Sequence, residues 1–132
     1  AELLSAENCR LMVPGGELER AGASACLSGR HALRNISKLY FQKCFISVAA
    51  ADLNAGYMVD TEDEAELYQI LMQHSEQTTL LLAYSKFDQS ALVPLCPLHE
   101  IRTVISNIQM PEAYKSYYFD HGVTVFTTIK DL

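Results

Sequence analysis

The sequence lacks a long hydrophobic run and is poor in basic residues. No apolar stretch approaches the roughly 20 residues that a membrane-spanning helix needs, and the N-terminus has neither the basic nor the apolar region of a signal peptide. Lysine and arginine total 10 against 16 aspartates and glutamates, which gives a net charge of −6. A surface of this sign repels a phosphate backbone. We therefore expect no membrane contact and no DNA-binding surface on this chain.

Metal-site and redox motifs are absent as well. The four cysteines are Cys9, Cys26, Cys44 and Cys96. They form no CxxC pair and have no histidine at metal-ligand spacing, and the four dispersed histidines form no HExxH motif. Free thiols are typical of a reducing cytosol. We expect a cytoplasmic protein with no metal and no other cofactor.

Strong sheet and helix patterns alternate along the rest of the chain. Hydrophobic residues make up 49% of the sequence, which is enough for the core of one compact domain. The predicted strands, apolar enough to be covered on both faces, span residues 43–48, 78–83, 102–106 and 123–126. The predicted helices span residues 28–40, 61–74 and 111–122. This order predicts an α/β fold, a Rossmann-like, mostly parallel sheet with flanking helices and right-handed crossovers.

The N-terminal part gives weaker patterns. Residues 1–7 look like the end of a helix already under way, without an initiator methionine, which suggests an excised fragment. Arg10–Val13 reads as a short strand closed by the turn formers Pro14, Gly15 and Gly16. Residues 49–56 and 92–98 are expected to be connections.

Several polar and glycine-containing segments follow the predicted strands. These are Gly15–Gly16, Ala49–Gly56, Tyr84–Lys86 and Asn107. Ligands of parallel sheets collect at the carboxyl ends of the strands. We therefore expect these segments to share one rim, with Gly16, Asp52 and Lys86 around a common hollow.

Five motifs, in register over nearly the whole chain, resemble the C-terminal sensor domain of the DeoR family of bacterial transcription regulators. They are Pro14–Leu18, Phe45–Val48 with Asp52–Gly56, the acidic helix start Thr61–Glu64, Ser85–Phe87 and Leu98–Ile101. The resemblance implies a fold shared with ribose phosphate isomerases and CoA-handling enzymes such as CoA transferases. It implies a module that binds a phosphorylated sugar, does no chemistry and belongs to a homo-oligomeric regulator of carbohydrate metabolism.

The resemblance also implies that residues 1–132 are a partial sensor domain. A winged helix-turn-helix domain, N-terminal to everything shown here, would bind DNA. The first strand–helix units of the sensor domain would be absent too, together with an Asp-Ser-Gly-Thr type loop that cradles the phosphate in the family. The chain departs from the family pattern at Ala49–Ala50, Tyr68 and Ala83, where relatives carry Asp-Gly, Lys and Asp. Either the effector is unusual or sensing has decayed.

The candidate ligand-binding residues are Gly15, Gly16, Glu17, Asp52, Gly56, Asp60 and Lys86. Lys86 suits a phosphate or a sugar hydroxyl, although a solvent-exposed turn lysine explains it equally well. Asp52 and Asp60 can accept hydrogen bonds from sugar hydroxyls, but turn and cap chemistry also favours aspartate there. The three glycines permit close approach of a ligand or simply a positive φ.

Two other functions stay open. An isomerase-like enzyme could act on a sugar phosphate through Asp52 or Glu64 with Lys86. We expect no enzyme, because Ala49, Tyr68 and Ala83 have replaced the polar groups that would support such a site. A degenerate structural or oligomerisation module is the third reading.

Overall fold

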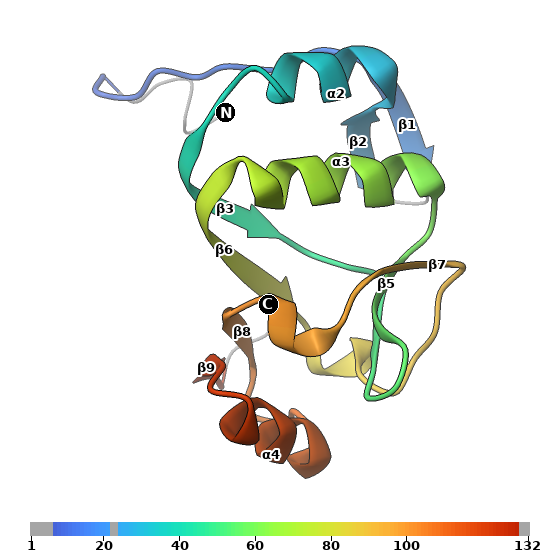
Figure 1. Cartoon of the computed structure of the whole chain (residues 1–132), viewed down its shortest axis with the longest axis vertical. Helices are drawn as coiled ribbons and strands as arrows, with labels where there is room; N and C mark the ends of the chain where they lie inside the picture. The colour runs from blue at the N-terminus through green and yellow to red at the C-terminus, as the bar shows by residue number, and fades with distance from the viewer. Residues whose placement is uncertain (1–6, 22–23, 130–132) are drawn as a thin grey trace.

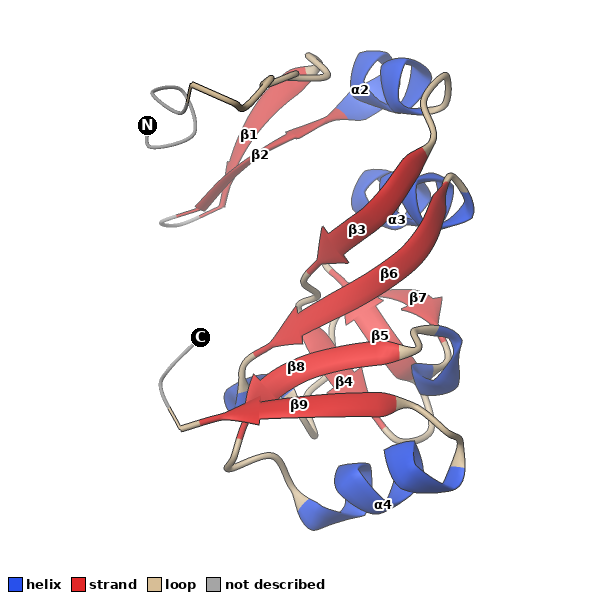
Figure 2. Cartoon of the chain, turned by 90° about the vertical axis from the view of Figure 1, so that its left-hand side faces the viewer, coloured by secondary structure: helices blue, strands red, loops and turns tan. Residues whose placement is uncertain are grey.

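A computed structural model describes residues 7–21 and 24–129 of the chain. The predicted parallel sheet is confirmed. Its four strands, all parallel and in the order β3-β6-β8-β9, are β3 (Phe41–Ile46), β6 (Ser75–Leu82), β8 (Thr103–Asn107) and β9 (Thr124–Thr128). Figure 2 looks onto this sheet. No helix in the described part of the chain is long and apolar enough to cross a membrane.

Two helices link strands of this sheet. Helix α3 (Glu62–Gln73) connects β3 to β6 by way of a hairpin, and α4 (Glu112–Asp120) connects β8 to β9. The predicted cap of α3 is present, because the Thr61 side chain accepts a hydrogen bond from the Glu64 amide. Inward-facing side chains such as Leu80, Val104 and Tyr118 are fully buried in one core.

Among the described residues, no helix covers one face of the parallel sheet. The strands follow one another in a single direction across the sheet, and right-handed crossovers then place every connection on the same side. Figure 2 shows the other side facing the viewer. Phe45, Leu81 and Phe126 lie on it with exposures of 59%, 37% and 58%. The expectation of cover on both faces is therefore wrong for the described residues.

A second sheet occupies two segments that we predicted as connections. It is antiparallel, in the order β4-β5-β7, and its strands are β4 (Ala50–Asp52), β5 (Gly56–Val59) and β7 (Val93–Cys96). Gly56, at φ +81, begins β5 where an added Cβ would lie 2.3 Å from the Cys96 carbonyl oxygen. Tyr57 and Val59 are fully buried in the core that the two sheets share. The connection prediction failed because strands of three and four residues, one containing Pro94, have no clear alternation.

The N-terminal part differs most from the prediction. The predicted strand Arg10–Val13 is wrong: residues 9–16 contain no strand, and Met12 and Val13 are 62% and 66% exposed. An antiparallel hairpin follows instead, made of β1 (Glu17–Ala21) and β2 (Ser24–Ser28). Helix α2 (Gly29–Ile36) ends earlier than predicted and packs against α3. The helix predicted for residues 1–7 lies almost wholly outside the described residues.

Candidate functional site

The carboxyl ends of β6 and β8 are tied together by side chains. The Asn107 side-chain oxygen accepts a hydrogen bond from the Tyr84 amide at 2.9 Å, and Asn107 is only 2% exposed. The Ser106 hydroxyl donates to the Leu82 carbonyl. These bonds fix the start of η1 (Tyr84–Lys86), the short 3-10 turn that follows β6. The turn that carries Lys86 is therefore hydrogen-bonded at its start to the carboxyl end of β8.

Tyr114 of α4 joins the segments beside η1. Its hydroxyl lies 3.1 Å from the Ala51 carbonyl oxygen and 2.9 Å from Asp88 Oδ1, and it accepts a bond from the Asp88 amide. Burial, together with the bond to Asp88, raises the pKa of Tyr114 to about 12. The hydroxyl therefore stays protonated and holds β4 and the chain after η1 against the core.

Asp52 and Lys86 are brought to neighbouring segments. Ala51 of β4 forms a parallel bridge with Phe87. Asp52 follows Ala51 and Lys86 precedes Phe87, so the two residues lie on adjoining segments, on opposite sides of the bridge. Oδ2 of Asp52 accepts bonds from the amides of Asn54 and Ala55 at 3.0 and 2.9 Å, and this closes the β4–β5 turn. Turn chemistry thus accounts for one Asp52 oxygen. The other oxygen remains available to a ligand.

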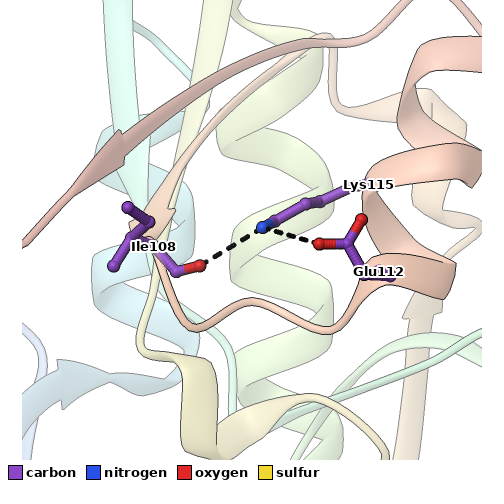
Figure 3. A network of polar contacts seen from close by, with 3 residues as sticks. All are labelled: Ile108, Glu112 and Lys115. Atoms are coloured by element: carbon purple, nitrogen blue, oxygen red, sulfur yellow. Dashed lines mark hydrogen bonds and ion pairs between the residues drawn. The ribbon is translucent and has the colours of Figure 1, made fainter.

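Lys86 is exposed and makes no ion pair or side-chain hydrogen bond within the described part of the chain. Lys115, which also lies near the carboxyl end of β8, differs. Its Nζ bonds Glu112 at 3.2 Å and the Ile108 carbonyl at 3.3 Å, as Figure 3 shows. Among the described residues, Lys86 is therefore an uncommitted cation at this rim.

The Gly15–Gly16 turn does not lie beside Asp52 and Lys86. A Cβ on Gly16 would lie 2.4 Å from the Ser28 carbonyl oxygen and 2.8 Å from the Ala32 side chain, so the turn packs on α2. Figures 1 and 2 place α2 and β1, the strand that begins at Glu17, at one end of the long axis, and Figure 2 shows β4 away from that end. The expected common hollow of Gly16, Asp52 and Lys86 is not formed, because residues 10–13 are not a strand of the parallel sheet.

Local structure accounts for the two remaining candidates, Gly56 and Asp60. Gly56 packs against the Cys96 backbone, and Asp60 is exposed just before the cap of α3. Sequence reasoning missed Asp88 and Tyr114. A non-glycine φ of +57 at Asp88 has no sequence signature, and Tyr114 reads as ordinary core of a helix. Among the described residues, no group of three or more histidine, cysteine, aspartate or glutamate side chains could hold a metal ion.

The sequence matches a known protein family. The family of the DeoR C-terminal sensor domain matches residues 1–107, which end with β8. The chain belongs to this family. Helix α4 and β9 lie beyond the matched part of the DeoR sensor domain, and with them lies Tyr114.

Proteins similar to this DeoR sensor domain are regulators of transcription by name. It is 30% identical over 109 residues to an aga operon transcriptional repressor of Escherichia coli O157:H7, covering 83% of this chain and 40% of that protein. Over 88 residues it is 27% identical to the L-fucose operon activator of Haemophilus influenzae, covering 67% and 35%. Over 122 residues it is 25% identical to the HTH-type transcriptional regulator GlpR of Haloferax volcanii, covering 92% and 47%. The chain thus spans less than half the length of these relatives.

Proposed function

We propose that this DeoR sensor domain binds a phosphorylated sugar, or a close derivative, at the carboxyl end of the parallel sheet. The observation that carries the proposal is the exposed, uncommitted Lys86 on a segment that pairs with β4 next to Asp52, at the carboxyl end of the sheet. Lys86 would donate to a phosphate oxygen as a point charge. Asp52 would accept from a sugar hydroxyl through the oxygen that the turn does not use.

The names of the relatives support a role in carbohydrate metabolism, since two of them regulate an aga operon and an L-fucose operon. In this proposal the domain works in the cytoplasm within a homo-oligomeric regulator. A separate domain binds DNA, in keeping with the net charge of −6 on this chain. Control then requires that the sugar phosphate bind two states of the regulator with different affinities. No catalytic step is part of the proposal.

The sheet topology supports the further proposal that strand–helix units outside these residues complete the sensor domain. Strand β3 is the first strand in the sheet order, so its outer edge is open among the described residues. Where successive added strands lie progressively farther from β3, their right-handed crossovers run in the opposite direction and place the helices over the uncovered face. Such a reversal of winding at β3 would also create the crevice in which α/β sheets bind ligands.

Calorimetry of the full-length regulator against sugar phosphates tests the ligand proposal. Lys86→Ala removes one charged hydrogen bond, so we expect the dissociation constant of the bound ester to rise about 10- to 100-fold. Lys38→Ala, at an exposed lysine in the turn after α2, is the matched control and should leave the affinity unchanged.

Three results would contradict the proposal. The absence of heat and of thermal shift with every ester would leave a structural module. Equal effects of the two lysine substitutions would remove the role of Lys86. Turnover of an ester that Lys86→Ala abolishes would indicate an isomerase-like enzyme.

A further inference from the structure

A hollow among the described residues lies at the opposite end of the sheet from Lys86. Its volume is about 760 Å³, and its walls are the last turns of α3, the first residues of β6 and the chain from β7 to the start of β8. In a parallel sheet these are the amino ends of the strands, away from the carboxyl-end rim. The hollow is therefore separate from the site proposed above.

The hollow follows from the register of the sheet. Strand β6 begins at Ser75, but its pairing with β8 begins only with Thr79 and Thr103. Residues 75–78 therefore extend past the start of β8, as Figure 2 shows, with no neighbouring strand on that side. In one wall, the side-chain amide of Gln69 donates a hydrogen bond to the Leu95 carbonyl oxygen at 3.3 Å. The offset between the starts of β6 and β8 leaves this space beside residues 75–78.

The lining combines hydrogen-bonding groups with an apolar wall. The exposed Gln73 and Gln77, which carry side-chain amides, and the half-buried Thr78 and Thr103, which carry hydroxyls, are among the lining residues. Met72, Leu95 and Cys96 supply the apolar wall. Sugars and polyols need both, because their hydroxyls require donors and acceptors while their C–H groups favour apolar contact. The volume lies within the range of about 300 to 1,000 Å³ that is usual for small-ligand sites.

The charges of the hollow disfavour a phosphate. Two carboxylates, Glu76 and Glu100, line it together with one guanidinium, that of Arg102. Arg102 already donates to the carbonyls of His99, His121 and Gly122 at 3.0 to 3.2 Å. Its donors are thus largely taken up by backbone. An anionic ligand would meet a net negative lining without a free cation.

From this geometry we propose that the amino-end hollow binds an uncharged sugar or polyol. The carboxylates and amides accept from and donate to its hydroxyls, and the apolar wall contacts its C–H groups. The regulator would then have two chemically distinct sites at opposite ends of the strands of one sheet. One takes the phosphate ester, and the other takes the uncharged molecule.

Backbone amide NMR of the whole chain tests this proposal with galactose, mannitol and their phosphate esters as probes. We expect the uncharged probes to shift amides within residues 69–78 and 95–103, and each ester to bind there at least about tenfold more weakly than its parent. Gln73→Ala and Gln77→Ala each remove uncharged hydrogen bonds and should weaken binding about three- to tenfold. Glu100→Gln should narrow the difference between ester and parent.

Gln109→Ala, at an exposed glutamine outside the hollow, is the matched control and should change nothing. Thermal unfolding of each variant verifies that it folds. The proposal is overturned if no uncharged probe moves these amides. It is also overturned if the shifts occur only around residues 84–88, or if an ester binds the hollow as tightly as its parent.

Discussion

The hydroxyl of Tyr114 makes contacts with two other segments of the chain. One hydroxyl connects α4 with β4 and with Asp88, three segments that are distant in sequence. Asp88 adopts a left-handed φ of +57, a conformation that costs free energy for a residue with a Cβ. The bonds to Tyr114 offset that cost. Local backbone strain is thus tolerated where it positions the segment after Lys86.

Tyr114→Phe is expected to lower the free energy of unfolding by about 1 to 3 kcal/mol, because the Asp88 amide loses its acceptor in a partly buried place. Urea unfolding followed by circular dichroism measures the loss. Tyr84→Phe, at a 47% exposed tyrosine, is the control and should change the stability by less than about 0.5 kcal/mol. Equal losses in the two variants would show that the Tyr114 hydroxyl contributes nothing special.

The alkaline stability of the chain depends on its buried phenols and thiols. Burial raises the pKa of Tyr114 from 10.0 to about 12 and that of Cys96 from 9.0 to about 12, and it also raises the pKa values of Tyr57 and Tyr118. Unfolded chains therefore lose these protons first, and stability falls as the pH rises from about 9 towards 12. Urea unfolding across this window measures the slope, which Tyr114→Phe should reduce. A stability that stays constant over the window would refute the prediction.

At the scale of elements, long and regular patterns were predicted well and short ones were not. Helix α3 and the strands β3, β6, β8 and β9 occur close to where the apolar runs and the helical spacing predicted them. The hairpin β4–β5 and strand β7 were missed, because their strands of three and four residues pair only through the folded core. The apolar run at Leu11–Val13 shows the opposite error, a strand predicted where none forms. It has strand composition but no strand neighbour among the described residues.

The carboxyl-end site could be predicted only in part for the same reason. A lysine following a buried strand is visible in sequence, and so is an aspartate in a small-residue turn. Their proximity depends on the bridge between Ala51 and Phe87, which only tertiary pairing creates. Gly15 and Gly16 do not reach the rim, because no strand of the parallel sheet precedes them.

The N-terminal cap of α3 gives a test at this scale. Thr61→Ala removes the acceptor of the Glu64 amide and should cost about 1 kcal/mol of stability. Thr61→Asp keeps an acceptor at the cap and should retain most of that stability. Thermal or urea unfolding of both variants measures the difference. If Thr61→Asp is as destabilised as Thr61→Ala, capping is not the cause.

At the scale of the whole molecule, the single direction of winding is the dominant feature. It leaves one face of a parallel sheet open, although such sheets are usually covered on both sides. The DeoR relatives are more than twice as long as their alignment with this chain. Additional units of the regulator therefore offer a physical means of covering that face.

Phe45→Ser distinguishes a covered face from an open one. In the 132-residue chain the Phe45 side chain is 59% exposed, so we expect its loss to change stability by less than about 1 kcal/mol. In the full-length regulator the same substitution should cost about 3 kcal/mol or more, since a covered phenylalanine would be removed from a core. Chemical unfolding of both forms gives the comparison. Equal costs would count against the proposed completion of the sheet.

Strand β9 ends the sheet on its other side with the sequence Thr-Val-Phe-Thr-Thr. It carries neither a charge nor a proline, the two devices that commonly keep an outermost strand from recruiting a further strand. Phe126, 58% exposed, adds apolar surface to it. Concentrated solutions of this chain should therefore be prone to aggregation through β9. A charged residue or a proline on this strand would improve solubility more than any change to the interior.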